Sequence, residues 1–142
     1  MVGCGGSDML TGWGTMGYNR EALNERGLLE AEQFCYLTTT GRKSGKAHTI
    51  EIWFAMEEGS PKLYMLAGGR ERSDWVQNIG VDPVVKVRIG SREFHGRGRV
   101  VTEREEEMLA RRLVVKKYYG RDRVNSDGWE AESLLMVVEV SF

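Results

Sequence analysis

The residues best suited to chemistry lie in one predicted turn, residues 41–46, with the sequence Gly-Arg-Lys-Ser-Gly-Lys. This turn carries three cations, although the formal net charge of the chain is only −1. A phosphate-binding site requires exposed backbone N–H groups, small residues that permit close approach, hydroxyl donors and cations. The stretch supplies all of these, at Thr38, Thr40, Gly41, Arg42, Lys43, Ser44, Gly45 and Lys46. The sequence therefore predicts either an anion-binding turn or a solvated hairpin tip whose cations only increase solubility.

A second basic loop, residues 68–73, follows the next predicted strand and leads into a predicted helix. Its sequence is Gly-Gly-Arg-Glu-Arg-Ser. The N-terminus of a helix attracts anions through its free N–H groups and its macrodipole. If the strands are neighbours, the two basic loops can meet at one rim of a barrel. Such a rim suits an anionic ligand whose flat ring lies against the sheet.

Two known phosphate-binding motifs are matched only in part. Residues 12–17, GWGTMG, fit the dinucleotide fingerprint. That motif works only at the start of the helix of a βαβ unit, and no parallel βαβ units are predicted here. Residues 41–46 are not a P-loop, because one residue too few separates the glycines and the turn joins two strands.

Candidates for acid–base or metal chemistry are few. His48 and His95 are the only histidines, and neither has a cysteine or carboxylate nearby at the spacing of a metal site or a catalytic triad. No metal site is therefore expected, and the catalytic residues are left unassigned. Binding residues without evident reaction machinery fit a cofactor that carries the chemistry itself.

Composition narrows the class of protein. A chain of 142 residues and 16.1 kDa matches one domain, and a pI near 6.2 argues against nucleic-acid binding. The two cysteines, Cys4 and Cys35, are too few for a disulfide framework or a zinc site. No apolar run approaches the about 20 residues that span a bilayer, and the N-terminus lacks the pattern of a secretory signal. We therefore expect a cytoplasmic protein with no integral membrane segment.

Hydrophobic alternation predicts six strands, over residues 34–40, 47–56, 62–67, 84–89, 92–102 and 134–140. A short helix is expected from Ser73 through Ile79 and a longer one over about 103–119. No linker or internal repeat is visible, so residues 1–142 are expected to form a single domain. Within it, residues 1–17 form a loose glycine-rich arm and residues 18–33 an N-terminal helix starting near Asn19. Mostly hairpin connections favour a mainly β (α+β) fold, a six-stranded antiparallel barrel with peripheral helices.

Two local patterns refine this expectation. Gly96 and Gly98, two residues apart in one strand, suggest sharp curvature or a close neighbouring backbone at a barrel corner. Thr102 and Glu105 have the spacing of a capping box for the long helix. The apolar stripe expected on that helix contains Met108, Leu109, Leu113, Val115 and Tyr119.

Four stretches, in this order and spacing, resemble the deazaflavin (F420)-dependent nitroreductase family: YLTTTGRKSGK, EIWF, LYMLAGG and SDWVQNIGVDPVVKVRIG. The resemblance covers about residues 34–119 and, more weakly, the last strand. It implies the split β-barrel fold shared with flavin reductases and pyridoxamine-phosphate oxidases. It also implies an oxidoreductase that transfers a hydride from reduced coenzyme F420 to a quinone, a nitroaromatic compound or an activated enone. Because split barrels commonly pair, a homodimer is expected.

The resemblance also assigns cofactor contacts. The basic turn is expected to hold the phosphate and acidic tail of F420, through Arg42, Lys43, Ser44 and Lys46 with Thr38, Thr40 and Gly45 beside them. The backbone of Ala67, Gly68 and Gly69 is expected to lie along the deazaflavin ring. Trp75 and Asn78 are expected to anchor the helix that follows.

Two departures from the family pattern concern the ring and the acceptor. Many members have a longer, serine-containing loop before the tryptophan, whereas Ala67-Gly68-Gly69 here reaches Trp75 quickly. A Tyr-His pair often follows that tryptophan, and here Val76-Gln77 takes its place. Two alternatives stay open at this point: an FMN-dependent split-barrel oxidoreductase, since the same turn can bind the phosphate of FMN, and a non-catalytic flavin- or deazaflavin-binding module.

Overall fold

The computed structural model describes residues 29–57, 59–125 and 128–141. The chain divides into two units, residues 1–31 and residues 32–142. The expected glycine-rich arm and the start of the N-terminal helix lie outside the described residues. The described end of that helix stops at Glu30 and does not continue to Gln33. One split-barrel domain over residues 1–142 stays a prediction.

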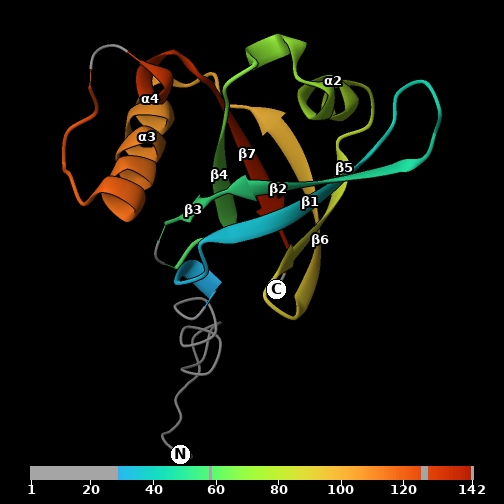
Figure 1. Ribbon diagram of the computed structural model, residues 1–142, viewed down its shortest axis with the longest axis horizontal. Coiled ribbons are helices and arrows are strands. Elements are labelled where there is room, and N and C mark those ends of the chain that lie inside the picture. Colours follow the sequence, from blue (N-terminus) through green and yellow to red (C-terminus); the bar gives the residue numbers. More distant parts are fainter. Residues whose placement is uncertain (1–28, 58, 126–127, 142) are drawn as a thin grey trace, which may run out of the picture. The chain divides into compact units, whose positions relative to one another are not determined.

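One seven-stranded antiparallel sheet forms the second unit, in the order β2-β1-β5-β6-β7-β4-β3 (Figure 1). Hairpins join β1 to β2 and β5 to β6, as the alternating pattern predicts. The strands are β1 (Phe34–Thr40), β2 (Ala47–Trp53), β3 (Ala55–Met56), β4 (Lys62–Ala67), β5 (Val84–Ile89), β6 (Arg92–Val100) and β7 (Leu134–Val140).

The sheet closes on itself through the segment 47–56. This segment was expected to be one strand, but it is interrupted at Phe54, so β2 pairs with β1 at one edge and β3 pairs with β4 at the other. The Phe54 N–H donates to the Tyr118 hydroxyl (2.9 Å), and the Phe54 carbonyl accepts from the Lys117 ammonium (2.8 Å). At Phe54, two side chains of the helix over residues 104–119 thus take the place of the backbone partners that a neighbouring strand would supply. The seventh strand is the separated end of the expected second strand.

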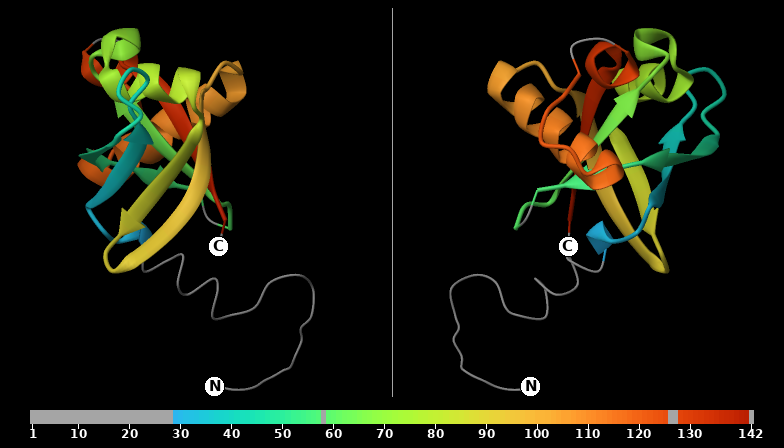
Figure 2. Two further views of the ribbon diagram at one scale, coloured as in Figure 1. Left: turned by 90° about the vertical axis from the view of Figure 1, so that its right-hand side faces the viewer. Right: turned by 60° about the vertical axis from the view of Figure 1, so that its left-hand side comes forward.

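Helices cover the barrel at one end and on one side (Figures 1 and 2). A 3-10 turn, η1 (Arg70–Arg72), leads into α2 (Asp74–Val81), and α3 (Arg104–Tyr119) is followed by α4 (Trp129–Glu132). The first turn of α3 carries acidic residues and its last turn basic ones, which suits the helix macrodipole. None of the helices in the described part of the chain combines the length and apolar character needed to span a bilayer.

The core lies inside the barrel and beneath α3. Alternate residues of β1 and β5 are buried, among them Cys35, Leu37 and Val87. Helix α3 packs on the barrel through Ala110, Val114 and Val115. Of the stripe expected there, Val115 is buried and Leu113 packs against the core, whereas Met108 and Tyr119 are 47% and 42% exposed. The middle of the expected stripe is therefore confirmed, and its two ends are wrong.

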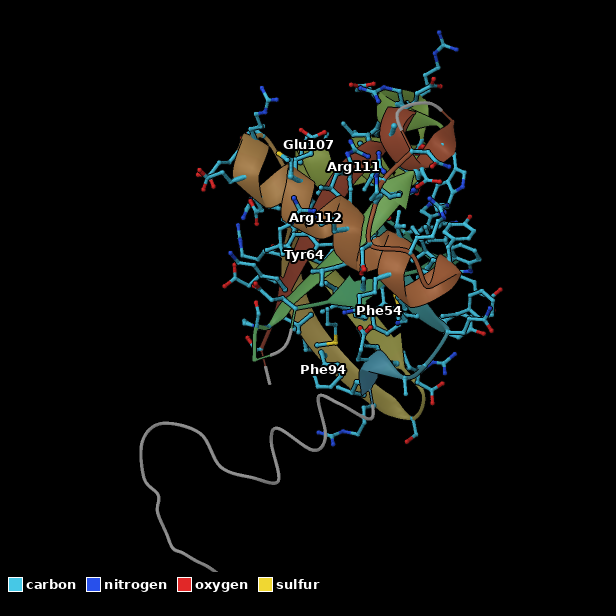
Figure 3. All side chains as sticks on the ribbon, turned by 90° about the vertical axis from the view of Figure 1, so that its left-hand side faces the viewer. Phe54, Tyr64, Phe94, Glu107, Arg111 and Arg112 are labelled. Atoms are coloured by element: carbon cyan, nitrogen blue, oxygen red, sulfur yellow. The ribbon has the colours of Figure 1, made fainter. Side chains whose placement is uncertain are left out.

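Tyr64 connects the barrel to α3 at a charged cluster (Figure 3). Its buried hydroxyl donates to Glu106 (2.9 Å), and the same carboxylate accepts two hydrogen bonds from Arg99 (3.2 Å each). The hydrogen bonds from Arg99 are the main reason that the pKa of Glu106 is lowered. One carboxylate thus joins β4, β6 and α3.

The two glycines of β6 mark the barrel corner, as expected. A Cβ at Gly96 would lie 2.6 Å from the Glu139 carbonyl oxygen, and one at Gly98 would lie 3.0 Å from the Ile79 side chain. Around them β6 changes partner, from β5 to β7. Glycine at position 96 thus permits the close approach of the β7 backbone, and glycine at position 98 leaves room for the Ile79 side chain of α2.

The expected capping box is absent. Helix α3 begins one residue later, with Glu103 at the N-cap and no side-chain cap hydrogen bond. Because Thr102 stands before the cap, its hydroxyl is not positioned to accept from the first turn. Helix α4, which the sequence did not predict, is only four residues long.

Candidate functional site

The β1–β2 turn is held by its own backbone. The Gly41 N–H donates to the Lys46 carbonyl (2.8 Å), and the Gly45 N–H donates to the Gly41 carbonyl (2.9 Å). Gly45 has a φ of 72°, a conformation that favours glycine. The Lys46 N–H donates to the Ser44 hydroxyl (3.1 Å). The second glycine of the turn is thus required by its backbone conformation.

The tip of this turn presents free donors. Within the part of the chain that the structure describes, the backbone N–H groups of Lys43 and Ser44 have no hydrogen-bond acceptor. The exposed ammonium groups of Lys43 and Lys46 likewise have no carboxylate partner there. Two adjacent N–H groups beside two cations form the donor set of an anion site.

Helix α2 fixes the base of the turn through one buried amide. The Asn78 side chain is 3% exposed and donates to the Thr39 hydroxyl (3.1 Å). Its oxygen accepts from the Arg42 backbone N–H (3.1 Å) and from the Arg42 guanidinium (2.9 Å). Asn78 therefore ties β1, the turn and α2 together.

Arg42 does not point freely into solvent. Its guanidinium pairs with the Asp74 carboxylate (3.1 Å) in addition to Asn78. The Arg42 side chain is 22% exposed, whereas that of Asp74 is 87% exposed. We call Arg42, Asp74 and Asn78 the turn clamp. It joins two elements that are more than 30 residues apart in the chain.

A cavity of about 490 Å³ lies between the turn and α2. Five of the predicted site residues line it: Arg42, Lys43, Ser44, Trp75 and Asn78. The remaining wall comes from Gly41 of the predicted anion-binding turn and from five residues that were not predicted to belong to the site: Thr39, His48, Thr49, Ile50 and Asp74.

Seven predicted site residues do not line this cavity: Thr38, Thr40, Gly45, Lys46, Ala67, Gly68 and Gly69. Thr38 shares a hydrogen bond with Thr49 (2.7 Å) on the outer face of the β1–β2 pair. Gly68 is exposed, and a Cβ added there would meet nothing within 4 Å. The backbone at the end of β4 is therefore open to a flat ligand.

The second basic loop has a different role from that of the turn. The Arg70 guanidinium donates to the Glu132 carbonyl, and Arg70 has a φ of 53°, which non-glycine residues rarely adopt. This contact directs the first cation of the loop toward α4. The loop does not contribute to the cavity beside the β1–β2 turn.

One residue that was not predicted to belong to the site, Asp74, had a signal in the sequence. It lies four residues before the predicted site residue Asn78 on a predicted helix, so the two side chains lie on one face. His48 lies at the cavity with its Nε2 atom 3.5 Å from the Ser44 hydroxyl. The described residues contain no group of histidine, cysteine, aspartate or glutamate side chains placed to hold a metal ion.

Several solved structures share this fold. A Bacteroides thetaiotaomicron protein assigned to 5-nitroimidazole antibiotic resistance is 13% identical, with a TM-score of 0.67 over 87% of this chain and 81% of that chain. A Listeria innocua protein assigned as a pyridoxamine 5'-phosphate oxidase is 14% identical. Its TM-score is 0.59, over 83% of this chain and 90% of that chain. The fold is thus the split β-barrel of pyridoxamine-phosphate oxidases, as expected.

Among the similar structures is an F420H2-dependent reductase, 26% identical, with a TM-score of 0.57 over 75% of this chain and 94% of that chain. Another similar structure is a domain-swapped dimer. It is 24% identical, with a TM-score of 0.57 over 84% of this chain and 96% of that chain. No curated protein matches the sequence. The model of the F420H(2)-dependent quinone reductase family matches residues 15–129. The chain therefore belongs to this family, whose cofactor is F420 and whose activity is oxidoreduction.

Proposed function

We propose that the β1–β2 turn binds the anionic tail of F420 and that the protein transfers a hydride from reduced F420 to a quinone. The observation that carries this proposal is the set of free donors at the turn, two ammonium groups and two adjacent backbone N–H groups. Family membership supports the identity of the cofactor.

The donor set fits the chemistry of the tail. A phosphate and carboxylates need several N–H donors and positive charge, which Lys43, Lys46 and the Ser44 N–H supply. A Cβ at Gly41 would lie 2.7 Å from both His48 Nε2 and Ser44 Oγ, so a side chain here would displace these two side chains from the turn. The small residue permits the compact shape that presents these donors.

Arg42 has a different role in this proposal from that of the lysines. The turn clamp already uses its guanidinium, so Arg42 positions the turn rather than contributing a free cation. This differs from the expectation that Arg42 holds the tail directly. The lysines at the tip are the residues that contact the ligand.

The ring of the cofactor is proposed to lie along Ala67, Gly68 and Gly69. The open space beside Gly68 supports this placement. Reduced F420, when bound, supplies the hydride. The protein orients the ring relative to the acceptor and excludes water, and half-buried Trp75 forms part of the wall of the neighbouring cavity.

A quinone is the favoured acceptor because the family is named for quinone reduction. Nitroaromatic compounds are a second candidate, supported by the 5-nitroimidazole resistance assigned to one similar structure. Activated enones are a third. We further propose a cytoplasmic homodimer, and the domain-swapped dimer among the similar structures supports pairing.

The test of this function is a fluorescence titration of ligand-free protein with oxidised F420 and, in parallel, with FMN. The double variant K43Q/K46Q is expected to bind F420 about tenfold or more weakly, because a hydrogen bond to a charged group contributes about 1.5–3 kcal/mol. Its affinity is also expected to depend less on salt. The matched control R97Q/K116Q removes two exposed cations on β6 and α3 and should bind F420 normally.

Unchanged affinity of K43Q/K46Q would refute the role of the turn. Preference for FMN would contradict F420 as the cofactor. Turnover is measured with reduced F420 against quinones, nitroaromatic compounds and enones. Binding without turnover of any acceptor would instead support the non-catalytic binding module. Light scattering at several protein concentrations tests the dimer.

A further inference from the structure

A second cavity, of about 720 Å³, lies between α3 and the segment that leads to α4. In Figures 1 and 2, α3 is on the other side of the barrel from the β1–β2 turn. None of the residues that line this cavity belongs to the turn or to α2. We call it the α3 cavity. Its size falls within the range of about 300–1,000 Å³ that small-molecule sites occupy.

One face of α3 forms the floor of the α3 cavity. Arg104, Met108, Arg111 and Arg112 all line it, and their spacing of four, seven and eight residues puts them on one side of a helix. Met108 is 47% exposed, and Val124 faces the same cavity from the connecting segment. The floor is therefore apolar at its centre and basic around it.

The Arg111 side chain, which is labelled in Figure 3, lines this cavity and is held in place by several hydrogen bonds. Its guanidinium donates to the Glu107 carboxylate (2.7 and 3.1 Å) and to the carbonyls of Glu130 (3.1 Å) and Ser133 (2.9 Å). The Arg111 side chain is only 11% exposed. These contacts neutralise Glu107 and hold α3 against α4.

Three further arginines at the α3 cavity have no partner for their guanidinium groups within residues 29–57, 59–125 and 128–141: Arg104, Arg112 and Arg123. The lining contains four guanidinium groups and two carboxylates, those of Glu107 and Asp122. Since Glu107 is already bound to Arg111, positive charge is left in excess. Guanidinium groups that face one cavity repel each other unless an anion lies between them.

We propose that the α3 cavity binds an organic phosphate with at least two phosphate groups. Arg112 and Arg123 bind the phosphates, since the planar guanidinium donates two parallel hydrogen bonds to a phosphate. The apolar or ring part of the ligand lies against Met108 and Val124. The site is separate from the proposed F420 site, so it gives the protein a second ligand.

The test is calorimetric titration of the full chain with inorganic pyrophosphate and with ADP. The double variant R112Q/R123Q is expected to bind both probes about tenfold or more weakly, since each lost charge-assisted hydrogen bond contributes about 1.5–3 kcal/mol. The control R97Q/K116Q also removes two positive charges, but at residues that do not line the cavity, so it should bind pyrophosphate and ADP with unchanged affinity. M108Q should weaken ADP more than pyrophosphate.

Three results would overturn the proposal. One is the absence of saturable binding of either probe at millimolar concentration. A second is equal weakening in R97Q/K116Q, which would indicate only a general charge effect. The third is loss of pyrophosphate binding in K43Q/K46Q together with normal binding in R112Q/R123Q, which would assign the anion to the β1–β2 turn. All exchanged side chains except Met108 are exposed cations, so thermal unfolding should be unchanged.

Discussion

Replacing Asn78 by Ala tests whether the turn clamp stabilises the fold. The substitution removes one hydrogen bond to Thr39 and two to Arg42. It leaves the Thr39 hydroxyl, in a side chain that is 2% exposed, without this partner. A hydrogen bond contributes about 0.5–1.5 kcal/mol, and an unpaired buried polar group costs about 1–3 kcal/mol.

We therefore expect N78A to lower the free energy of unfolding by about 2–4 kcal/mol. For a chain of this size, 1 kcal/mol shifts Tm by about 2–4 °C, so the expected loss is about 4–16 °C. Urea denaturation measures the free energy of unfolding, and calorimetry measures Tm. The control is Q77A at the preceding residue, whose exposed amide donates to the carbonyls of Glu71 and Arg72. Its expected effect is within about 0.5 kcal/mol.

A double-mutant cycle locates the effect in the clamp. If Asn78 acts partly through Arg42, N78A and R42A together should cost less than the sum of the single substitutions, by about 1 kcal/mol or more. The reasoning is refuted if N78A unfolds at the same denaturant concentration as Q77A. Strict additivity with R42A would show that the two side chains stabilise the protein independently.

Three further outcomes are expected. G68A should weaken F420 binding without loss of stability, because the added methyl group occupies the proposed ring site. The control G80A should bind F420 normally. If G68A and G80A bind F420 with equal affinity, the ring does not lie beside Gly68. Because the pKa of Glu106 is lowered by Arg99 in the folded state, its contribution to stability is present above the unfolded pKa and is lost as pH falls through the folded pKa. E106Q should therefore lose less stability than the wild type between about pH 5 and pH 3, and parallel curves in acid denaturation would contradict this. Burial raises the pKa of Cys35 to about 12, so peptide mapping after alkylation of the native protein should find Cys35 unmodified, and rapid labelling would show that the barrel opens.

Local patterns predicted the strands well because their information lies in adjacent residues. Alternation placed β1, β4, β5 and β7 at their observed positions, and the glycine pair predicted the corner of β6. The interruption at Phe54 had no local signal. It depends on Lys117 and Tyr118, which are 63 and 64 residues away.

The same distinction applies to the site. Residue types alone allowed either an anion-binding turn or a solvated hairpin tip, and anion binding stays a prediction. The structure adds that donors at Lys43, Ser44 and Lys46 have no partner among the described residues. The different role of Arg42 was not visible, because the partners of its guanidinium lie 32 and 36 residues further along the chain. Only the fold brings Asp74 and Asn78 to the turn.

The closure of the barrel at Phe54 has a consequence for its local opening. Two residue pairs, Ala55–Tyr64 and Met56–Leu63, join β3 to β4, whereas six pairs join β4 to β7. Hydrogen exchange should therefore be faster in β3 than in β7, since a short ladder opens at a lower free energy. The strand that opens is continuous with β2 and hence with the turn. A ligand held at the turn should thus slow amide exchange at Met56, although it does not contact that residue.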